Sequence, residues 1–221
     1  MGTTRAEDCQ GQQPEREYLV SIRPEVIDAT GHWLGNLLQR LRAIEQGLER
    51  DASSLAEPLK RTVDDLERLS RCLLDYLAAT PAGLELFHAR EVLATIVLTL
   101  DRSYRPEPSA GELAECDFEL LVNPVALETA VRYLPALLSE DGVPVGAVVV
   151  VHAATEGDRF VIGLSAEKSN PRRSAAGELY HAVMEKYLVG QGGGFWSNAS
   201  YRGGREWFLC LSRACLSQTE N

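Results

Sequence analysis

Two neighbouring segments of this 221-residue chain, residues 24–50 and 55–79, carry apolar side chains at alternating steps of three and four. In the first segment they are Ile27, Leu34, Leu37, Leu41, Ile44 and Leu48, with Thr30 in the one gap. In the second they are Leu55, Leu59, Leu66, Leu69, Leu73 and Tyr76, with Thr62 in the gap. This spacing places the apolar side chains on one stripe of an α-helix and is typical of coiled coils. The sequence therefore predicts two long amphipathic helices.

A polar segment, residues 51–54, separates the two predicted helices. Pro24 suits the first turn of the first helix, and Ser53 or Ser54 suits the N-cap of the second. Helices joined by about four residues fold back antiparallel. The apolar stripe of such a hairpin is covered either by a second copy, as a dimeric four-helix bundle, or by the chain's own C-terminal domain. The regular spacing, which does not drift toward 3.6 residues, favours the dimer.

The remainder of the chain, which begins after the helix-breaking segment Thr80–Gly83, predicts an α+β fold with helices on one face of a mixed sheet. We expect strands near residues 84–87, 116–122, 145–154, 159–165, 194–201 and 206–212. We expect helices near residues 88–100, 124–138 and 174–189. The Pro-rich stretch 105–111 predicts a loop.

Composition and charge argue against several classes of protein. The net charge of -10 argues against a nucleic-acid partner. No run of about 18 apolar residues predicts a membrane span, and the polar N-terminus lacks the apolar core of a secretory signal. We therefore expect a cytoplasmic protein without a membrane partner. The five scattered cysteines predict buried thiols rather than a disulfide framework or a zinc site.

His32 is the residue on which a chemical hypothesis can rest. It follows Ile27 by five residues, so it falls on the outward face of the first helix, next to Gly35 and Asn36 at i+3 and i+4. An imidazole titrates near neutrality, so a nucleophilic neutral fraction is always present. Gly35 costs about 1 kcal/mol relative to alanine inside a helix, which makes sense if a partner's backbone approaches His32 closely. Taken alone, a lone histidine such as His32 is more often an exposed residue without function.

The segment Gly31–Leu38 (GHWLGNLL) resembles the H-box of histidine kinases, in which a histidine is followed at i+4 by Asn or Thr. The hairpin is similar to that family's dimerisation and phosphotransfer domain. Asn123–Glu128 resembles the D-P-x-x-L start of a key helix of its ATP-binding domain. The stretch 187–213, with Gly192–Gly194, is similar to that domain's ending of helix, H-G-G, strand, G-x-G-T and strand. The resemblance spans residues 22–213 and rests mainly on the order of the parts.

Departures from the family pattern argue against ATP binding. Trp33 follows His32 where kinases keep an acidic residue that acts as a base. Tyr133 and Leu137 stand where the resemblance implies two asparagines that hold magnesium, and neither side chain coordinates that ion. Residues 166–170 replace the expected Asp-x-Gly-x-Gly, and residues 171–174 replace the Gly-rich ATP lid. The loss of several motifs together indicates that the chain has lost its nucleotide site.

A degenerate kinase core of this kind is similar to the histidine phosphotransferases of phosphorelays. The resemblance implies that His32 is the phosphoacceptor, that Asn36 is its polar neighbour, and that response-regulator receiver domains donate and accept the phosphoryl group. The receiver would supply magnesium, so this chain is expected to bind no cofactor or metal itself. Expected partner-binding residues beside His32 are Asp28, Trp33, Gly35 and Gln39. Trp33 fits packing against its own domain as well as it fits an interface anchor.

The predicted organisation is a flexible polar leader (1–21), a helical hairpin for dimerisation and phosphotransfer (22–80), a degenerate ATPase-like α/β sandwich (81–215) and a tail (216–221). A homodimeric phosphorelay phosphotransferase is the favoured function. One alternative is a non-catalytic pseudokinase that docks on and regulates a histidine kinase or a response regulator. Another is a divergent kinase that keeps nucleotide binding.

Overall fold

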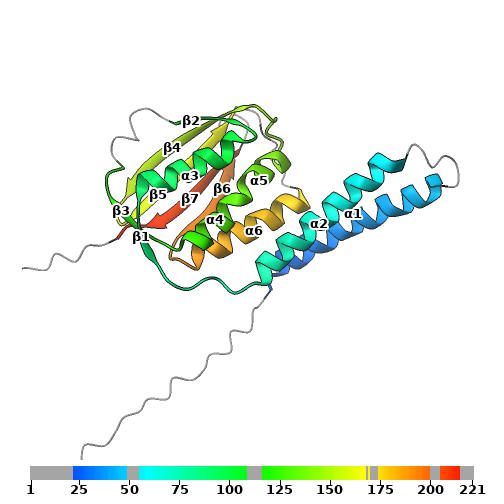
Figure 1. The fold of residues 1–221 in the computed structure, drawn as a ribbon, viewed down its shortest axis with the longest axis horizontal. Coiled ribbons are helices and arrows are strands. Elements are labelled where there is room, and N and C mark those ends of the chain that lie inside the picture. The colour runs from blue at the N-terminus through cyan, green and yellow to red at the C-terminus, as the bar shows by residue number, and fades with distance from the viewer. Residues whose placement is uncertain are drawn as a thin grey trace, which may run out of the picture.

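The computed structural model describes residues 22–48, 55–108, 116–167, 169, 174–199 and 205–214. Helices α1 (Pro24–Leu48) and α2 (Ala56–Leu77) lie antiparallel and form a hairpin that projects from an α/β domain (Figure 1). The predicted hairpin is thereby confirmed. Ser53 and Ser54, the predicted N-caps of α2, lie outside the described residues.

The domain is built on a mixed sheet of five strands in the order β2-β4-β5-β7-β6, beside a two-stranded antiparallel sheet of β1 and β3. Strand β2 runs parallel to β4, and the other neighbours in the larger sheet are antiparallel. The strands are β1 (Glu85–His88), β2 (Arg105–Pro108), β3 (Glu119–Val122), β4 (Val148–Glu156), β5 (Arg159–Ala166), β6 (Gly194–Ala199) and β7 (Arg205–Ser212).

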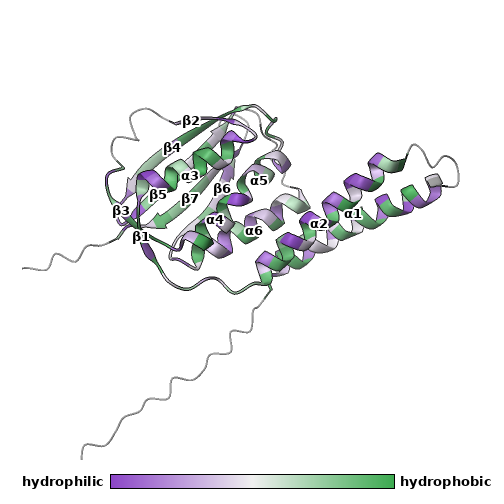
Figure 2. Ribbon diagram, in the orientation of Figure 1, coloured by the Kyte–Doolittle hydropathy of each residue, from purple (hydrophilic) through white to green (hydrophobic). Residues whose placement is uncertain are grey.

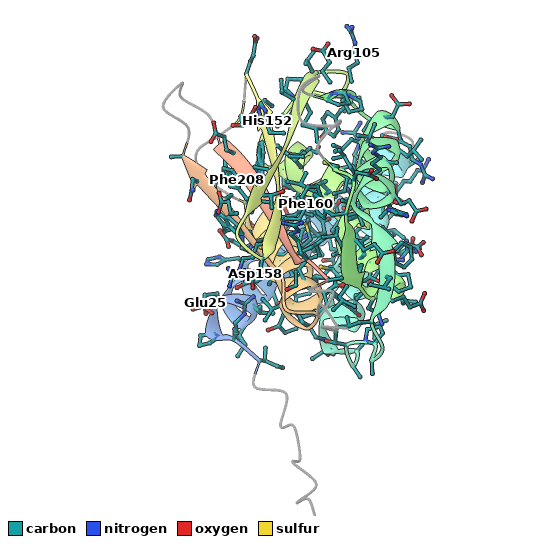
Figure 3. The ribbon with its side chains drawn as sticks, turned by 90° about the vertical axis from the view of Figure 1, so that its left-hand side faces the viewer. Glu25, Arg105, His152, Asp158, Phe160 and Phe208 are labelled. Atoms are coloured by element: carbon teal, nitrogen blue, oxygen red, sulfur yellow. The ribbon has the colours of Figure 1, made fainter. Side chains whose placement is uncertain are left out.

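The domain's helices cover one face of the sheet, as predicted for an α+β fold (Figure 1). They are α3 (Ala89–Asp101), α4 (Pro124–Arg132), α5 (Leu134–Glu140) and α6 (Ala175–Val189). Side chains alternate between the two faces of a strand, so Phe160, Ile162 and Leu164 of β5 all enter the core under the helices. Figure 3 shows the two layers from the side, with His152 and Phe208 on the face of the sheet that the helices leave open.

Two predictions about the domain are wrong. Residues 105–108 of the expected loop form β2, which pairs with β4, and residues 109–111 lie outside the described part. Proline has no N–H to donate, but an edge strand tolerates it because one side of the strand has no neighbour. The single helix expected at 124–138 is two helices that meet at Tyr133, because Pro135 cannot donate a hydrogen bond to the carbonyl group of Val131.

The hairpin packs on the domain through one stripe of buried side chains. They are Val26, Ala29, Trp33 and Leu37 of α1, with Leu69, Cys72 and Tyr76 of α2. Only part of the predicted stripe is buried in this way. Ile27, Leu34 and Leu41 stay exposed, and so do Leu59 and Leu66. The domain therefore covers Leu37, Leu69 and Tyr76 of the predicted stripe, together with four side chains that the three-and-four spacing did not mark: Val26, Ala29, Trp33 and Cys72.

The composition also predicted buried cysteines and no membrane-spanning helix. Cys72, Cys116 and Cys210 are buried, as predicted for structural thiols. Within the described ranges, no helix is long and apolar enough to span a membrane. Figure 2 shows hydrophobic residues along the central strands and mixed character along the hairpin.

Asn123 ties the connection between the hairpin and the domain to the rest of the fold. Its Oδ1 accepts a hydrogen bond from the backbone N–H of Ala126 at 2.9 Å and thereby caps α4. Its Nδ2 donates to the carbonyl oxygens of Ala82 and Gly83, at 3.2 and 2.6 Å. Its own backbone N–H donates to Oε1 of Gln191 at 2.8 Å. One buried amide thus serves both as a helix cap and as an anchor of the linker.

Replacing Asn123 by alanine is expected to lower the free energy of unfolding by about 2 kcal/mol, because the cap is lost and linker carbonyl groups lose a donor. Urea denaturation followed by circular dichroism measures this change. Asn198→Ala, on the exposed part of edge strand β6, is the control and should change stability by less than about 0.5 kcal/mol. Equal effects of the two substitutions would show that the Asn123 contacts do not contribute.

Candidate functional site

His32 is exposed on α1, in the half of the helix that packs on the domain. Asp28, Asn36 and Gln39 are exposed as well, and Gly35 is half-buried. Positions three and four apart share a helix face, so these residues form one continuous surface around the imidazole. The structure thus brings together all the predicted site residues except Trp33.

Trp33 is buried, with 7% of its surface exposed. Its indole meets the ring of Tyr180 on α6 edge-on, with centroids 5.7 Å apart and an interplanar angle of 86°. A side chain held in the core in this way is not available as an anchor for a partner. The prediction that Trp33 binds a partner is therefore wrong for this structure, and the alternative prediction, packing on its own domain, describes its position.

The position of Trp33 defines where its two sequence neighbours point. Successive residues of an α-helix are rotated by about 100°, so His32 and Leu34 lie on opposite flanks of the domain-facing side chain of Trp33. The two flanks are about 160° apart. The imidazole and the exposed leucines therefore belong to different surfaces of the hairpin.

The exposed apolar side chains of the hairpin form what we call the apolar stripe. Its members are Ile27, Leu34, Leu38 and Leu41 of α1, with Leu59, Val63, Leu66, Leu74 and Leu77 of α2. Ile27 is 58% exposed and Leu74 is 69% exposed, which is unusual for large apolar side chains that recur along two adjacent helices. A contact through the apolar stripe would leave His32 accessible.

Gly31 directly precedes His32 and Gly35 follows it by one helical turn, so both lie on the same side of the imidazole. A Cβ atom built on Gly31 or on Gly35 would meet no heavy atom within 4 Å. No packing within the described residues therefore requires a glycine at either position, although each lowers helix stability by about 1 kcal/mol relative to alanine. The glycines leave the helix surface beside the imidazole without side chains.

A groove of about 680 Å³ lies between α1 and α2 toward the loop of the hairpin. Its floor is apolar and includes Ile44 and Pro58, and its rim carries charged groups. The carboxylate of Asp65 on this rim accepts hydrogen bonds from both Arg40 and Arg68. Arg40 follows His32 by two helical turns, about 12 Å along the axis of α1.

This groove could not be predicted from the sequence, because it forms only when the two helices lie side by side. The alternation of Arg40, Asp65 and Arg68 across the hairpin is the one signal that points to it, and it becomes visible only after the two helices are paired in register. The spacing of apolar residues, which predicted the two helices, gives no information about these charged residues.

The two positions at which the resemblance implies magnesium-binding asparagines are occupied by packed side chains. Leu137 is completely buried. The ring of Tyr133 stacks on that of Tyr180 at 5.5 Å, and its hydroxyl group donates to Oδ2 of Asp75 on α2 at 2.5 Å. Burial and the hydrogen bond to Asp75 raise the pKa of Tyr133 far above its ordinary value, so the hydroxyl group keeps its proton. Both side chains serve the packing of the domain.

The strand that would lead into an adenine-binding motif ends beside a buried ionic contact. Asp141 is completely buried and accepts a hydrogen bond from Nε1 of Trp207 at 2.7 Å. Nε of Arg205 lies 3.7 Å from the same carboxylate oxygen, and the backbone N–H of Arg205 donates to Oγ of Ser169. Residues 168 and 170–173, which include most of the expected lid, lie outside the described residues. Across the part of the chain that the structure describes, no three acidic, histidine or cysteine side chains are grouped as a metal site would need.

No protein-family model matches the chain, and no curated protein is similar in sequence. Among solved structures, the chain is similar to the histidine kinase AdeS of Acinetobacter baumannii, with 14% identity, a TM-score of 0.49, and coverage of 82% of this chain and 95% of that one. It is also similar to the mycobacterial sensor histidine kinase MprB, with 13% identity, a TM-score of 0.42, and coverage of 59% and 98%. The catalytic domain of the histidine kinase ThkA gives 8% identity, a TM-score of 0.44, and coverage of 60% and 98%. Similarities at this level assign neither a family nor an activity to the chain.

Proposed function

We propose that the chain is a phosphorelay histidine phosphotransferase, which carries a phosphoryl group on His32 between the aspartates of two response-regulator receiver domains and does not bind ATP. The observation that carries this proposal is the placement of His32. The imidazole is exposed on a helix fixed to the domain, and Gly35, one helical turn further along, has no side chain that would obstruct a partner beside it.

The chemistry needs a neutral imidazole and an activated phosphoryl donor. A ring nitrogen of His32 attacks the phosphorus of an aspartyl phosphate, so that a P–N bond forms while the P–O bond to the donor carboxyl group breaks. The donor aspartate leaves as a carboxylate. In the second step, a carboxylate oxygen of another receiver attacks the phosphorus, and the P–N bond breaks with its electron pair returning to the ring. The receiver holds the magnesium ion that stabilises the charge of the transferring group, so this chain provides the nucleophile and its orientation.

The surface around His32 supports docking of a receiver domain. Asp28, Asn36 and Gln39 offer hydrogen-bonding groups of both kinds next to the imidazole. The groove that begins near Arg40 continues this surface toward the loop of the hairpin and adds an apolar floor with a charged rim. Apolar contact area bordered by charged groups is what a specific but reversible interface requires.

The interior of the domain supports transfer without nucleotide. Tyr133 and Leu137 are committed to packing, and Asp141 is committed to Trp207 and Arg205. Tyr133 and Leu137 stand at the positions where the resemblance implies asparagines that hold magnesium, so their packing supports the loss of that site.

We further propose that the protein is a homodimer whose two hairpins form a four-helix bundle through the apolar stripe. Covering that stripe with a second copy removes large apolar surface from water and leaves both His32 side chains on the outside of the bundle. A stem of this form presents two receiver-docking surfaces.

His32→Ala is expected to abolish phosphoryl transfer between receivers, because it removes the ring nitrogen that attacks the phosphorus. The receiver domains of the source organism, charged with acetyl phosphate, are mixed with the chain, and the label on each protein is followed over time. The wild-type chain should acquire acid-labile, base-stable label and pass it on. If His32→Ala keeps the cellular effect of the protein while transfer is absent in both, the pseudokinase alternative replaces this proposal.

Gly35→Ala is expected to stabilise the chain and to slow transfer. The added methyl group meets no atom of the chain, so removing the glycine should raise the melting temperature by about 2–4 °C. The same methyl group lies beside the imidazole, where it obstructs a partner. Gly31→Ala is the matched control, since it gives the same gain in helix stability on the flank nearer the apolar stripe. Equal transfer rates for the two variants would contradict a docking role for Gly35.

Leu34→Glu is expected to convert the dimer to a monomer, because it places a charge in the middle of the apolar stripe. Light scattering coupled to size-exclusion chromatography reports the mass of each species. Leu98→Glu replaces an even more exposed leucine on α3 and serves as the control that should remain dimeric. A wild-type chain that is monomeric at all concentrations tested would refute the proposed bundle.

A further inference from the structure

The carboxylate of Asp75, in the last turn of α2, is a point at which the hairpin and the domain are joined. Its Oδ2 accepts hydrogen bonds from the hydroxyl group of Tyr133 at 2.5 Å and from Nη2 of Arg132 at 2.9 Å. The backbone carbonyl oxygen of Asp75 accepts a third hydrogen bond, from the hydroxyl group of Tyr187 on α6 at 3.0 Å. Asp75 of the hairpin thus contacts the C-terminal end of α4 and helix α6 of the domain.

Lys186 of α6 makes a second connection at the same end of α2. Its Nζ donates to the carbonyl oxygens of Tyr76 and Ala78. The last carbonyl groups of a helix lack partners within the helix and carry its negative dipole end, and α2 has no basic residue of its own in its last turn. The domain therefore supplies the cation that closes the hairpin helix.

A ladder of three aromatic rings links this junction to the helix that carries His32. Tyr133 stacks on Tyr180 at 5.5 Å, and Tyr180 meets Trp33 edge-on at 5.7 Å. All three rings are buried. Because Trp33 adjoins His32 in the sequence, any displacement of the ladder moves the turn of α1 on which the imidazole stands.

The connection between α2 and the domain is held as well. Asn123 anchors the carbonyl groups of residues 82 and 83, so the linker does not act as an unrestrained hinge. Burial of Leu69, Cys72 and Tyr76 adds an apolar contact to these polar ones. Together these contacts oppose both sliding and rotation of the hairpin on the domain.

We propose that Asp75 and Tyr133 are positioning residues, which lock the hairpin and the domain into one rigid body and thereby set the position of His32 relative to the domain surface. The consequence for phosphoryl transfer rests on the proposed function, whereas the lock itself does not. In-line transfer depends on alignment of the nucleophile with the bond that breaks, and misplacement by about 1 Å costs on the order of 100-fold in rate. A fixed domain beside His32 restricts the orientations in which a receiver can approach.

Tyr133→Phe tests the lock, because it removes the hydroxyl group and keeps the stacked ring. Tyr104→Phe is the matched control, since Tyr104 is another buried tyrosine and its hydroxyl group donates to the carbonyl oxygen of Pro135 at 3.1 Å, inside the domain. Hydrogen exchange of the full chain, followed by mass spectrometry, separates local opening from global unfolding. The amides of residues 72–78 and 33–37 report on the lock, and those of 160–165 in β5 report on the domain core.

In Tyr133→Phe, we expect exchange at residues 72–78 and 33–37 to accelerate about tenfold relative to residues 160–165. Tyr104→Phe should show no such difference between the regions. Asp75→Asn keeps an oxygen that accepts from Tyr133 and should retain much of the protection, whereas Asp75→Ala should behave like Tyr133→Phe. The proposed lock would be refuted if exchange accelerated equally at residues 72–78, 33–37 and 160–165, or at none of these amides.

A second measurement connects the lock to transfer. Potassium phosphoramidate phosphorylates exposed histidines directly and needs no docking, so the rate at which it modifies His32 should be the same in Tyr133→Phe and the wild-type chain. Transfer from a receiver charged with acetyl phosphate should fall about tenfold in Tyr133→Phe and in Asp75→Ala. It should be largely retained in Asp75→Asn, which keeps an acceptor for the hydroxyl group of Tyr133. Transfer that is unchanged in Tyr133→Phe would show that these residues do not position His32. If the wild-type chain transfers no phosphoryl group at all, the proposed function fails while the exchange measurement still decides the lock.

Discussion

The contact of Trp33 with Tyr180 is the interaction on which the rest of this structure depends. It joins α1 to α6 through two large buried rings and fixes the rotation of α1 about its own axis. Once that rotation is set, helix geometry alone places His32 on one flank and the apolar stripe on the other. The same tyrosine continues through Tyr133 to Asp75, so one aromatic ladder connects the surface around the imidazole with the end of the hairpin.

The separation of these surfaces gives the hairpin three distinct uses. One face packs on the domain, a second is apolar and uncovered, and a third carries the exposed imidazole with polar neighbours. In the proposed phosphotransferase, the second face joins two copies and the third receives the partner. The domain then has no need of a nucleotide site, and its helices serve as the support that holds α1 and α2 in place.

Patterns that depend on local spacing could be predicted from the sequence. The hairpin and most elements of the domain follow from apolar periodicity and from glycine and proline breaks, and His32, Gly35 and Asn36 share a surface because they are close along one helix. Features that depend on distant contacts could not be predicted. Strand β2 forms in a Pro-rich stretch only because β4 offers its edge, and Trp33 is buried only because Tyr180 arrives from α6. The roles of Asp75 and Lys186 arise from residues more than 50 positions away, which no local pattern reveals.

Phosphorus-31 NMR of the full chain mixed with a phosphorylated receiver domain, without any nucleotide, tests the central claim most directly. The account predicts a phosphohistidine signal that maps to His32 by mass spectrometry and disappears when a second, unphosphorylated receiver is added. A phosphohistidine that forms only with ATP and magnesium, or phosphate that maps to a residue other than His32, would contradict it.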